Sequence, residues 1–427
     1  MAHSKMKIVL ANNYYYLLGG CERVLFDDEG ALVAAGHDVR PFAPYDERNS
    51  PAISASFFPH VSDYMAARGI GRAQAAVNLV RSTSAGRAFA EFLDDFRPDI
   101  VHCHNIYGRL TTAVLDEARR RRIPVVLTVH DHKLTCPAYL GLRQGEPCQL
   151  CTDGGYWRCL RWKCHKESTA ASFVYTIEAY YNRLSKKYDA VSQFLCPSRF
   201  MQAELIESGI QEERTVYHPN AIPVTAYSPQ FEPGNYALYA GRLSPEKGIL
   251  TMMEAFGQAR IPLRIAGSGP LDAEIRDLVE RRNLPVTLEG FCDGPRLAQL
   301  YRGAAFVIVP SEWYENAPMS ILESFAHGKP VLASDIGGNP ELVVDHEVGR
   351  VFPVRNVSRL KEMAMQMWTD KDGLRAMGRR ARRMAESQYD QKRRISDLVN
   401  IYENVIGRAA SGAEMPDRPQ GNAQSPA

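Results

Sequence analysis

Short runs of apolar residues recur along the chain, and each is followed by a turn and then by a stretch of mixed polarity. Apolar runs bounded by turn residues are typical of buried strands, whereas apolar positions three and four apart are typical of helices. In the first half the runs predict strands at residues 7–10, 38–42, 100–102, 125–129 and 194–197. In the second half they predict strands at residues 236–240, 263–266, 286–289, 306–309, 330–333 and 349–352.

Helical patterns separate these strands. In the second half they cover residues 249–258, 271–282, 296–302 and 319–327, and a long basic helical pattern follows at 374–405. Strands that alternate with helices are typical of parallel sheets covered by helices on both faces. Because the pattern runs twice in tandem, we expect an α/β protein of two doubly wound domains.

A proline-rich stretch separates the two series. Residues 219–234 contain Pro219, Pro223, Pro229 and Pro233 and show little periodicity, as expected of a linker. We therefore predict a first domain at 1–218 with a cysteine-rich insertion at 133–168, a second domain at 235–385, a C-terminal helix at 386–407 and a disordered tail at 408–427.

Composition narrows the class of protein. The 427 residues suffice for two domains with substantial cores. The 51 basic and 49 acidic residues give a net charge of +2, which provides no general attraction to nucleic acid or membrane. No apolar run is long enough for a transmembrane helix, and the run at 8–11 is too short for a signal-peptide core. We therefore expect a cytoplasmic protein whose nine cysteines are mostly reduced.

Two loops of the second domain have phosphate-binding features. The sequence Gly-Arg-Leu-Ser-Pro-Glu-Lys-Gly at 241–248 follows a predicted strand, so it lies at the edge of the sheet where α/β proteins bind ligands. Arg242 offers a planar fork to phosphate oxygens, and Lys247 offers a mobile charge near a helix N-terminus. Gly267 and Gly269 follow the next strand and permit a close approach of backbone to ligand. Each loop alone could equally be an ordinary turn.

The segment Pro-Ser-Glu-Trp-Tyr-Glu-Asn-Ala-Pro-Met-Ser-Ile-Leu-Glu at 310–323 is the strongest signal. It places Glu315 in a loop before a helix N-terminus and Glu323 inside that helix, with Asn316 and Ser320 between them. Carboxylates accept hydrogen bonds from paired hydroxyls, and a helix N-terminus favours phosphate. This order of groups fits a nucleoside diphosphate sugar laid along the start of the helix.

These motifs resemble those of glycosyltransferase family 4. The segment at 310–323 is similar to the family's E-x7-E motif in the form W-Y-E-N-x-P, and the loop at 241–248 resembles G-R-L-x-x-E-K-G. Residues 335–341 resemble the loop S-D-x-G-G-x-P-E-L that follows in the family. The resemblance runs from about residue 7 to about residue 404. It implies the GT-B fold, in which two Rossmann-like domains face each other across a cleft.

The resemblance also implies roles for these residues. Arg242 and Lys247 would neutralise the donor diphosphate, Glu315 would contact the transferred sugar, and Glu323 would contact the nucleotide ribose. It implies transfer with retention of anomeric configuration and without a catalytic metal. The chemistry agrees, because the leaving nucleoside diphosphate develops negative charge that fixed positive groups can stabilise.

The first domain contributes two further candidates. Gly20, in Gly-Gly-Cys-Glu at 19–22, resembles the family's G-G-x-E loop and would approach the donor phosphates or the acceptor. Glu22 in the same loop suits a helix cap better than a catalyst. The family places a sugar-contacting histidine at the position of His130, whereas we expect His102 and His104 to be structural.

Five of the nine cysteines fall within one short stretch. They are Cys136, Cys148, Cys151, Cys159 and Cys164. The Cys-x-x-Cys spacing at 148–151 is typical of metal sites, so a structural zinc held by four of the five is the leading interpretation. An iron–sulfur cluster and a set of free cysteines in a packed insertion are the alternatives.

We expect a transferase that moves a hexose-type sugar from a nucleoside diphosphate sugar to a glycan or lipid-linked acceptor, in the synthesis of a surface polysaccharide. The alternatives are a GT-B sugar-nucleotide epimerase and a nucleotide-sugar-binding protein without activity. The motifs fit UDP, GDP and ADP donors alike.

Two clusters of arginine bear on further partners. They comprise residues 119–122 and the set Arg379, Arg380, Arg382 and Arg383. Such clusters are either solvated helix faces or sites of attraction to anionic lipid headgroups at the inner face of the cell membrane. Nucleic acid is not expected as a partner, because the interleaved basic and aromatic residues typical of its binding sites are missing from the sequence.

Overall fold

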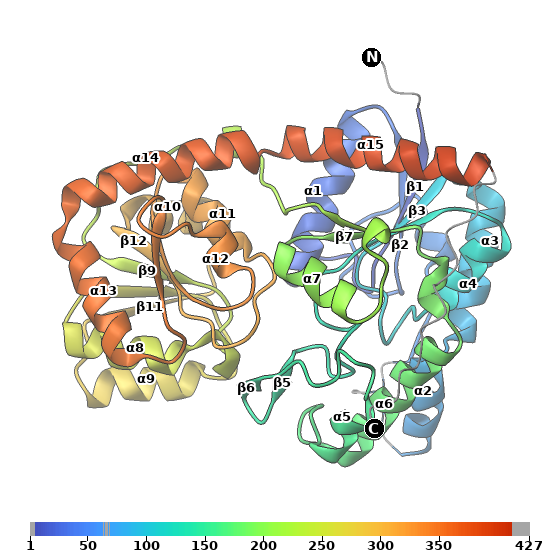
Figure 1. Cartoon of the computed structure of the whole chain (residues 1–427), viewed down its shortest axis with the longest axis horizontal. Coiled ribbons are helices and arrows are strands. Elements are labelled where there is room, and N and C mark those ends of the chain that lie inside the picture. The colour runs from blue at the N-terminus through green and yellow to red at the C-terminus, as the bar shows by residue number, and fades with distance from the viewer. Residues whose placement is uncertain (1–4, 63, 65–66, 68, 412–427) are drawn as a thin grey trace, which may run out of the picture.

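The computed structural model describes residues 5–62, 64, 67 and 69–411. It has two lobes, each built on a six-stranded sheet whose neighbouring strands are all parallel (Figure 1). The strand order is β2-β1-β3-β4-β7-β8 in the first sheet and β11-β10-β9-β12-β13-β14 in the second. The predicted α/β fold with two parallel, doubly wound sheets is therefore confirmed.

The strands of the first sheet are β1 (Lys7–Ala11), β2 (Asp38–Phe42), β3 (Ile100–Cys103), β4 (Val125–Thr128), β7 (Gln193–Cys196) and β8 (Thr215–Tyr217). Those of the second are β9 (Ala237–Ala240), β10 (Leu263–Ala266), β11 (Val286–Gly290), β12 (Phe306–Val309), β13 (Val331–Ser334) and β14 (Gly349–Phe352). A small antiparallel hairpin, β5 (Leu142–Arg143) and β6 (Glu146–Pro147), lies in the cysteine-rich insertion.

The helices of the first half are α1 (Gly20–Ala34), α2 (Ile70–Val80), α3 (Thr83–Phe96), α4 (Ala113–Arg120), α5 (Trp157–Arg161), α6 (Thr169–Leu184) and α7 (Arg199–Glu207). Those of the second half are α8 (Ile249–Ala259), α9 (Asp272–Arg281), α10 (Gly294–Gly303), α11 (Met319–Ala326), α12 (Asn339–Leu342), α13 (Val357–Thr369), α14 (Lys371–Gln388) and α15 (Gln391–Ala410).

The central strands β1, β3, β4 and β7 of the first sheet are buried on both faces, which explains why they are mostly apolar. Successive side chains of a strand point to opposite faces. In β1, Val9 and Ala11 pack in the cluster that includes α3, α4 and α7, whereas Ile8 and Leu10 pack in the cluster that includes α1 and α15. The second sheet is covered in the same way, by α8 and α13 on one face and by α11 and α14 on the other.

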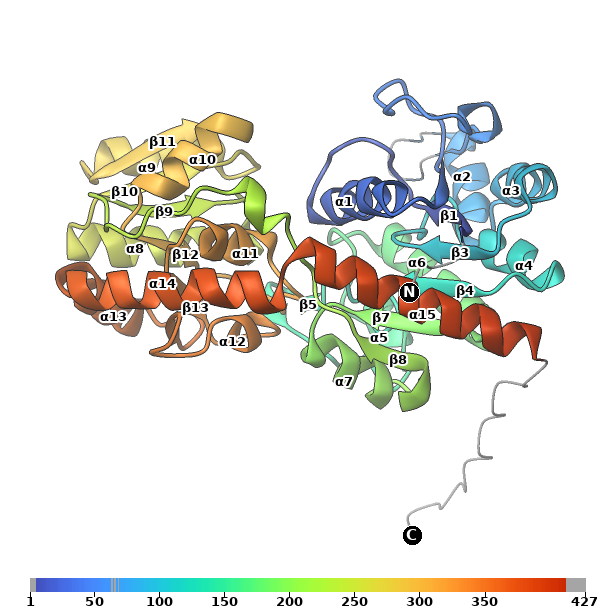
Figure 2. The ribbon, with the colours of Figure 1, turned by 90° about the horizontal axis from the view of Figure 1, so that it is seen from above.

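Helix α15 is the last element of the chain, yet it lies over the first sheet (Figures 1 and 2). Leu398 and Tyr402 are buried against β1 and β3, and the Tyr402 hydroxyl lies 2.6 Å from Nδ1 of His102. Arg394 forms a buried ion pair with Asp28 of α1. The chain therefore crosses from the second domain back to the first.

The two crossings between the domains lie side by side. Residues 219–234, predicted as a linker, contain no strand, and Ile222 within them is buried. The Ile222 N–H donates to the Tyr389 carbonyl at 3.0 Å, and the Gln391 N–H donates to the Ile222 carbonyl at 3.0 Å. Residues 408–410, predicted to start a disordered tail, continue α15 instead, and residues 412–427 lie outside the described residues.

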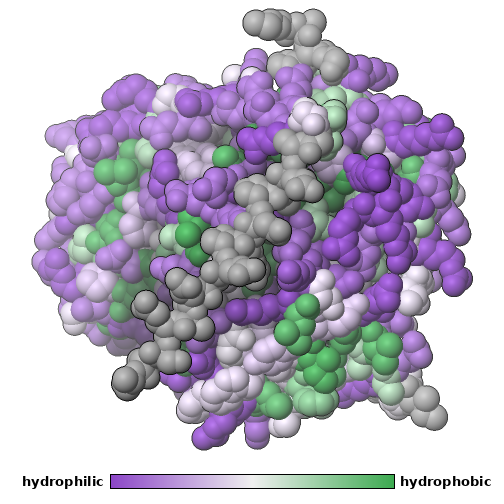
Figure 3. Space-filling model, turned by 45° about the vertical axis from the view of Figure 1, so that its right-hand side comes forward, coloured by the Kyte–Doolittle hydropathy of each residue, from purple (hydrophilic) through white to green (hydrophobic). Residues whose placement is uncertain are grey.

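No helix in the described ranges is long and apolar enough to cross a membrane. Most of the face seen in Figure 3 is hydrophilic, and apolar surface gathers near the lower end of the molecule.

Candidate functional site

Open α/β sheets bind ligands where their strand order reverses, at the carboxyl ends of the strands. In the second sheet this point lies between β9 and β12. The loop after β9 carries Arg242 and Lys247, and the loop after β12 carries Glu315. The structure brings Lys247 and Glu315 into contact, with 2.6 Å between Nζ and Oε1.

Glu315 is buried and held from several sides. Its Oε1 also accepts a hydrogen bond from the Ser311 hydroxyl at 2.5 Å. Burial acts to raise its pKa, but the charge of Lys247 and hydrogen bonds from Lys247 and Ser311 outweigh burial and lower the pKa of Glu315. The carboxylate is therefore ionised near neutral pH, and its hydrogen-bonding neighbours fix its position.

The loop at 335–341 supports Glu315 from behind. The Gly338 N–H donates to the Glu315 carbonyl at 2.7 Å. A Cβ atom at Gly338 would lie 1.9 Å from the Asn316 carbonyl oxygen, so this approach is open to glycine alone. The loop at 335–341 thus positions the loop that carries Glu315.

Gly267 and Gly269 hold the phosphate-side loops together. A Cβ atom at Gly267 would lie 1.8 Å from the Gly241 carbonyl oxygen, and one at Gly269 would lie 2.3 Å from the Leu243 carbonyl oxygen. The loop after β10 therefore packs backbone to backbone on the loop after β9. This contact orients the loop that carries Arg242.

Arg242 is exposed, and its guanidinium has no hydrogen-bonding or ionic partner in the part of the chain that the structure describes. Its backbone carbonyl is fixed by the Tyr239 hydroxyl at 2.7 Å. The side chain can therefore turn to an anion without breaking a contact.

Two helix N-termini meet at the domain junction. Met319 is the first residue of α11, and its Cγ lies 3.8 Å from where a Cβ atom on Gly20 would stand. Gly20 is itself the first residue of α1. Ser320 is the second residue of α11, so its backbone N–H lacks an intrahelical acceptor. Both helix ends favour an anion bound between the domains.

Glu323 lies within α11 and is partly buried. Its Oε2 accepts a hydrogen bond from the Tyr301 hydroxyl at 3.0 Å. Burial raises the pKa of Glu323, and the hydrogen bond from Tyr301 offsets only part of this effect. The carboxyl is thus placed to accept or exchange hydrogen bonds with a ligand at the start of α11.

His130 follows β4 and enters the junction from the first domain. Its Nε2 lies 2.9 Å from Nδ1 of His104, and the two rings are stacked with centres 5.2 Å apart. Burial lowers the pKa of His130 to about 3, so the ring is neutral and can donate one N–H bond. His102 and His104 are buried beneath it, as expected of structural histidines.

Asn316 connects the two domains. Its Oδ1 accepts from the Ser198 hydroxyl at 2.7 Å, and its Nδ2 donates to the Val129 carbonyl at 2.7 Å. Val129 precedes His130, so this contact sets the distance between His130 and Glu315. Both polar atoms of the Asn316 side-chain amide are engaged in this contact, and its predicted donor-binding role stays a prediction.

Sequence reasoning missed two further contacts between the domains. Nε2 of His132 donates to the Tyr314 carbonyl of the second domain at 3.0 Å, and Nδ1 of the same ring lies 2.9 Å from Oε2 of Glu204 in the first domain. Glu341 accepts from the N–H groups of Arg199 and Phe200 at 2.7 and 2.6 Å, at the start of α7. The motif Pro-Glu-Leu at 340–342 could have indicated the contact of Glu341, because a carboxylate after a glycine loop suits a helix N-terminus.

The predicted zinc site finds no support. All five cysteines of the insertion line one small cavity of about 20 Å³, together with Glu204. In the described ranges, however, no three Cys, His, Asp or Glu side chains are placed to hold one metal ion. Each of the five is a free thiol.

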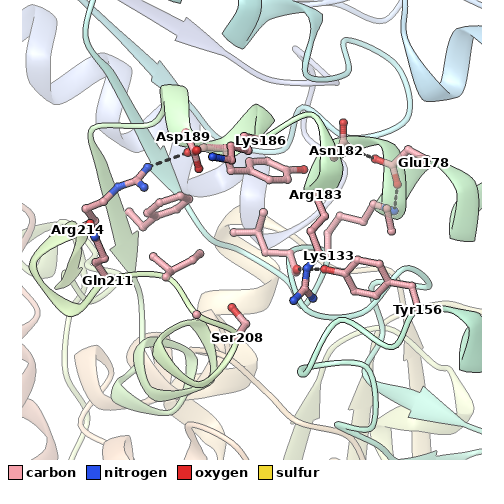
Figure 4. A pocket seen from close by; sticks show the side chains of 16 residues that line it. Lys133, Tyr156, Glu178, Asn182, Arg183, Lys186, Asp189, Ser208, Gln211 and Arg214 are labelled. Carbon is pink, nitrogen blue, oxygen red and sulfur yellow. Dashed lines mark hydrogen bonds and ion pairs between the residues drawn. The ribbon is translucent and has the colours of Figure 1, made fainter. Parts of the chain in front are cut away.

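A larger cavity of about 310 Å³ lies in the first domain (Figure 4). Residues of α6, of β7 and of the segment 208–211 that follows α7 line it, and Lys133 and Glu178 form a buried ion pair of 2.6 Å in its wall. None of the predicted site residues lines this cavity. It therefore belongs to a different part of the molecule from the Lys247–Glu315 pair.

Comparison with known proteins agrees with this geometry. The family model for glycosyl transferases group 1 matches residues 226–384, and that for the glycosyl transferase 4-like domain matches residues 19–221. The structure of Anabaena HepE in complex with UDP and glucose superposes with a TM-score of 0.66 at 16% identity, over 93% of this chain and 100% of that one. The chain belongs to the GT-B glycosyltransferases of the family 4 type.

Relatives of this glycosyltransferase act in several settings. It is 28% identical to O-antigen chain mannosyltransferase C of Escherichia coli over 178 residues, which are 40% of this chain and 47% of that protein. It thus spans about half the length of this relative. It is 24% identical to the glycogen synthase of Mycobacterium tuberculosis over 93% of this chain and 94% of that one. The family expected from the motifs is confirmed, and the relatives differ in sugar and acceptor.

Proposed function

We propose that this protein transfers a sugar from a nucleoside diphosphate sugar to an acceptor hydroxyl at the junction of its two domains. One observation carries the proposal: Lys247 and Glu315, from loops on either side of the switch point of the second sheet, lie 2.6 Å apart beside the N-terminus of α11. This arrangement offers a cation and a helix end to a diphosphate and a carboxylate to sugar hydroxyls.

Binding of the donor follows from the charges. Arg242, which is exposed, and Lys247 would contact the diphosphate, and the N-termini of α1 and α11 would add backbone N–H groups from Gly20 and Ser320. Glu323 would accept hydrogen bonds from the ribose. The complex of HepE with UDP and glucose supports a donor of this chemical class.

Transfer would proceed as the diphosphate leaves. The bond between the anomeric carbon and the phosphate oxygen breaks, the acceptor oxygen forms its bond on the same face, and the leaving phosphate oxygen takes the acceptor proton. Glu315 and the neutral ring of His130 would hold the sugar hydroxyls, and Arg242 and Lys247 would stabilise the developing negative charge. This route retains the anomeric configuration and assigns the charge-stabilising role to side chains without a catalytic metal.

We also propose that the transferred sugar is of the hexose type and that the acceptor is a glycan or a lipid-linked molecule. The protein would then take part in the synthesis of a surface polysaccharide, in the cytoplasm at the inner face of the cell membrane. The mannosyltransferase relative, named for O-antigen chains, supports a polysaccharide role. No step of the reaction depends on zinc at the cysteines.

The test is a product analysis. The purified protein is incubated with UDP-, GDP- and ADP-sugars and a panel of glycan acceptors, and proton NMR reports the configuration of each new anomeric centre. We expect one donor to be consumed with release of its nucleoside diphosphate and a product of unchanged configuration. An epimerised sugar nucleotide or free epimer without acceptor would instead identify an epimerase, and an inverted product would contradict the proposed route.

A further inference from the structure

Helix α6 is apolar on the side that it turns to solvent. Phe173, Ile177 and Leu184 are 50, 42 and 79% exposed. Their spacing of four and seven residues places them in one line along the helix. The opposite side is packed, since Ala171 and Ala179 are buried. Single exposed apolar side chains are common on protein surfaces, but a line of them along one helix indicates a binding surface.

Trp157 of α5 extends this line. It is 55% exposed, and its backbone N–H donates to the hydroxyl of Tyr180 on α6 at 3.1 Å. Helices α5 and α6 lie together at the lower end of the molecule, where Figure 3 shows apolar surface. We call Trp157, Phe173, Ile177 and Leu184 the apolar stripe.

Basic residues stand at the N-terminal end of the apolar stripe. Arg161, Lys163 and Lys166 precede α6 and are exposed, whereas Arg183 and Lys186 at its other end line the cavity of Figure 4. The exposed acid between residues 157 and 186 is Glu167. Glu178, the acid within α6, is buried and paired with Lys133 at 2.6 Å. The N-terminal end of the stripe therefore carries a net positive charge.

We propose that the apolar stripe docks the protein on an anionic lipid bilayer. Apolar side chains that enter the acyl region and basic side chains that reach the headgroups are the two contributions by which a surface helix binds such a membrane. Helix α6 has 16 residues, too few to span the bilayer, so it lies in the interface. A second copy of the chain fits less well, because a symmetric contact would bring the same basic residues of both copies into one interface.

This position differs from the arginine clusters predicted from the sequence. Arg120 and Arg121 are paired with Glu117, and Arg382 is paired with Glu386 and donates to backbone carbonyls. These three arginines are already paired with carboxylates of the chain. Among the described residues, Arg161, Lys163 and Lys166 form no such ion pair.

The docking surface adjoins the proposed reaction site through the insertion. The insertion follows His130 and leads directly into α6, and its hairpin β5–β6 reaches the second domain, where Arg355 pairs with Glu146. A bilayer bound at α6 would thus lie beside the element that borders the domain junction. The further consequence, that a lipid-linked acceptor reaches the junction from this side, rests on the proposed function.

The experiment is vesicle co-sedimentation of the purified full chain. Vesicles of phosphatidylcholine alone are compared with vesicles in which about one third of the lipid is phosphatidylglycerol. We expect binding to the second kind only, weakened by salt. The affinity of the triple variant Phe173→Ser, Ile177→Ser, Leu184→Ser for these vesicles should be at least about tenfold lower than that of the parent. The control Leu250→Ser, Phe291→Ser removes exposed apolar side chains of the second domain and should bind normally.

A charge pair separates the two candidate basic surfaces. Lys163→Glu with Lys166→Glu should lower binding several-fold, whereas Arg119→Glu with Arg120→Glu should not. Absence of binding to anionic vesicles, or a triple variant that binds as the parent does, would overturn the proposal. So would a parent that is dimeric by light scattering and a triple variant that is monomeric. Vesicle binding is measured without donor or acceptor. Absence of vesicle binding would therefore leave the proposed reaction untouched, and absence of sugar transfer would leave the proposed membrane docking untouched.

Discussion

At the scale of single residues, the proposed reaction depends on Glu315 and the groups that surround it. Its carboxylate forms an ion pair with Lys247 and accepts a hydrogen bond from Ser311, and its backbone carbonyl accepts one from the Gly338 N–H. A group fixed in this way can contribute to the transition state without reorganising when the reaction occurs. The charge of Glu315 should therefore matter more than its shape.

Replacing Glu315 by Gln keeps the size of the side chain and removes its charge. We expect the rate of transfer to fall by about 10²–10³-fold, since the amide neither anchors the Lys247 ammonium nor accepts from sugar hydroxyls on both oxygens. The control is Glu312→Gln, a loop carboxylate that bonds to Thr251 and Arg355. Equal losses in the two variants, measured as kcat/KM with the identified donor, would contradict the special role of Glu315.

Buried histidines make stability depend on pH. Burial lowers the pKa of His130 to about 3 and places the pKa values of His102, His104 and His218 well below the ordinary value. The unfolded chain takes up protons on these rings near pH 6.5, and the folded chain does not, so the free energy of unfolding should fall as pH drops below about 6.5.

Urea denaturation at about pH 7.5, 6.5 and 5.5 measures this dependence. His130→Asn should make the free energy of unfolding depend less steeply on pH. Replacement of the exposed His60 by Asn should leave this dependence as in the parent. A free energy of unfolding that stays level, or rises, between about pH 6.5 and 5.5 would show that the histidines are not protonated on unfolding.

At the scale of elements, the glycine loop at 335–341 and the loop at 310–318 act as one unit. Gly338→Ala would place a Cβ atom 1.9 Å from the Asn316 carbonyl oxygen. We expect a loss of about 1–3 kcal/mol in the free energy of unfolding and weaker donor binding, because the loop under Glu315 must move.

Gly30→Ala is the matched control, since no atom lies within 4 Å of its added Cβ and it sits inside α1. It should stabilise the protein by about 0.5–1 kcal/mol through helix propensity. If Gly338→Ala were also neutral or stabilising, the supporting contact between these loops would not exist in solution.

Elements with a strong local signal could be predicted from the sequence. The strands expected at 38–42, 263–266, 306–309 and 349–352 have the bounds that the structure shows. Strand β8 was missed because Thr-Val-Tyr is short and lies at the edge of the sheet, and β5 and β6 because each has two residues. Short elements depend on pairing partners and carry little pattern of their own.

The candidate site was predictable in part for the same reason. Lys247 and Glu315 lie on motif loops after strands, so their meeting follows from the topology. The contacts of Asn316 with Val129 and of His132 with Tyr314 join residues more than 180 positions apart. A local sequence pattern cannot indicate contacts between residues so far apart in the chain. These contacts are seen only once the two domains are placed relative to each other.

At the scale of the whole molecule, the C-terminal helix returns to the first domain and ties the two lobes together. Leu398→Ala should lower the free energy of unfolding by about 2–5 kcal/mol, because it opens a cavity between α15 and the first sheet. Asn400→Ala, exposed on the same helix, should have little effect. Denaturant titration of both variants measures the difference, and equal stabilities would show that α15 does not pack on the first domain.

The proposed function requires that the domain junction binds a nucleoside diphosphate through Arg242. The most direct measurement is the thermal midpoint of the purified protein with UDP, GDP, ADP and CMP, in the parent and in Arg242→Ala, with the exposed Arg276→Ala as the control. We expect that one nucleoside diphosphate raises the midpoint, that Arg242→Ala abolishes this rise, and that Arg276→Ala keeps it. No rise with any nucleotide, or a rise that survives in Arg242→Ala, would contradict it.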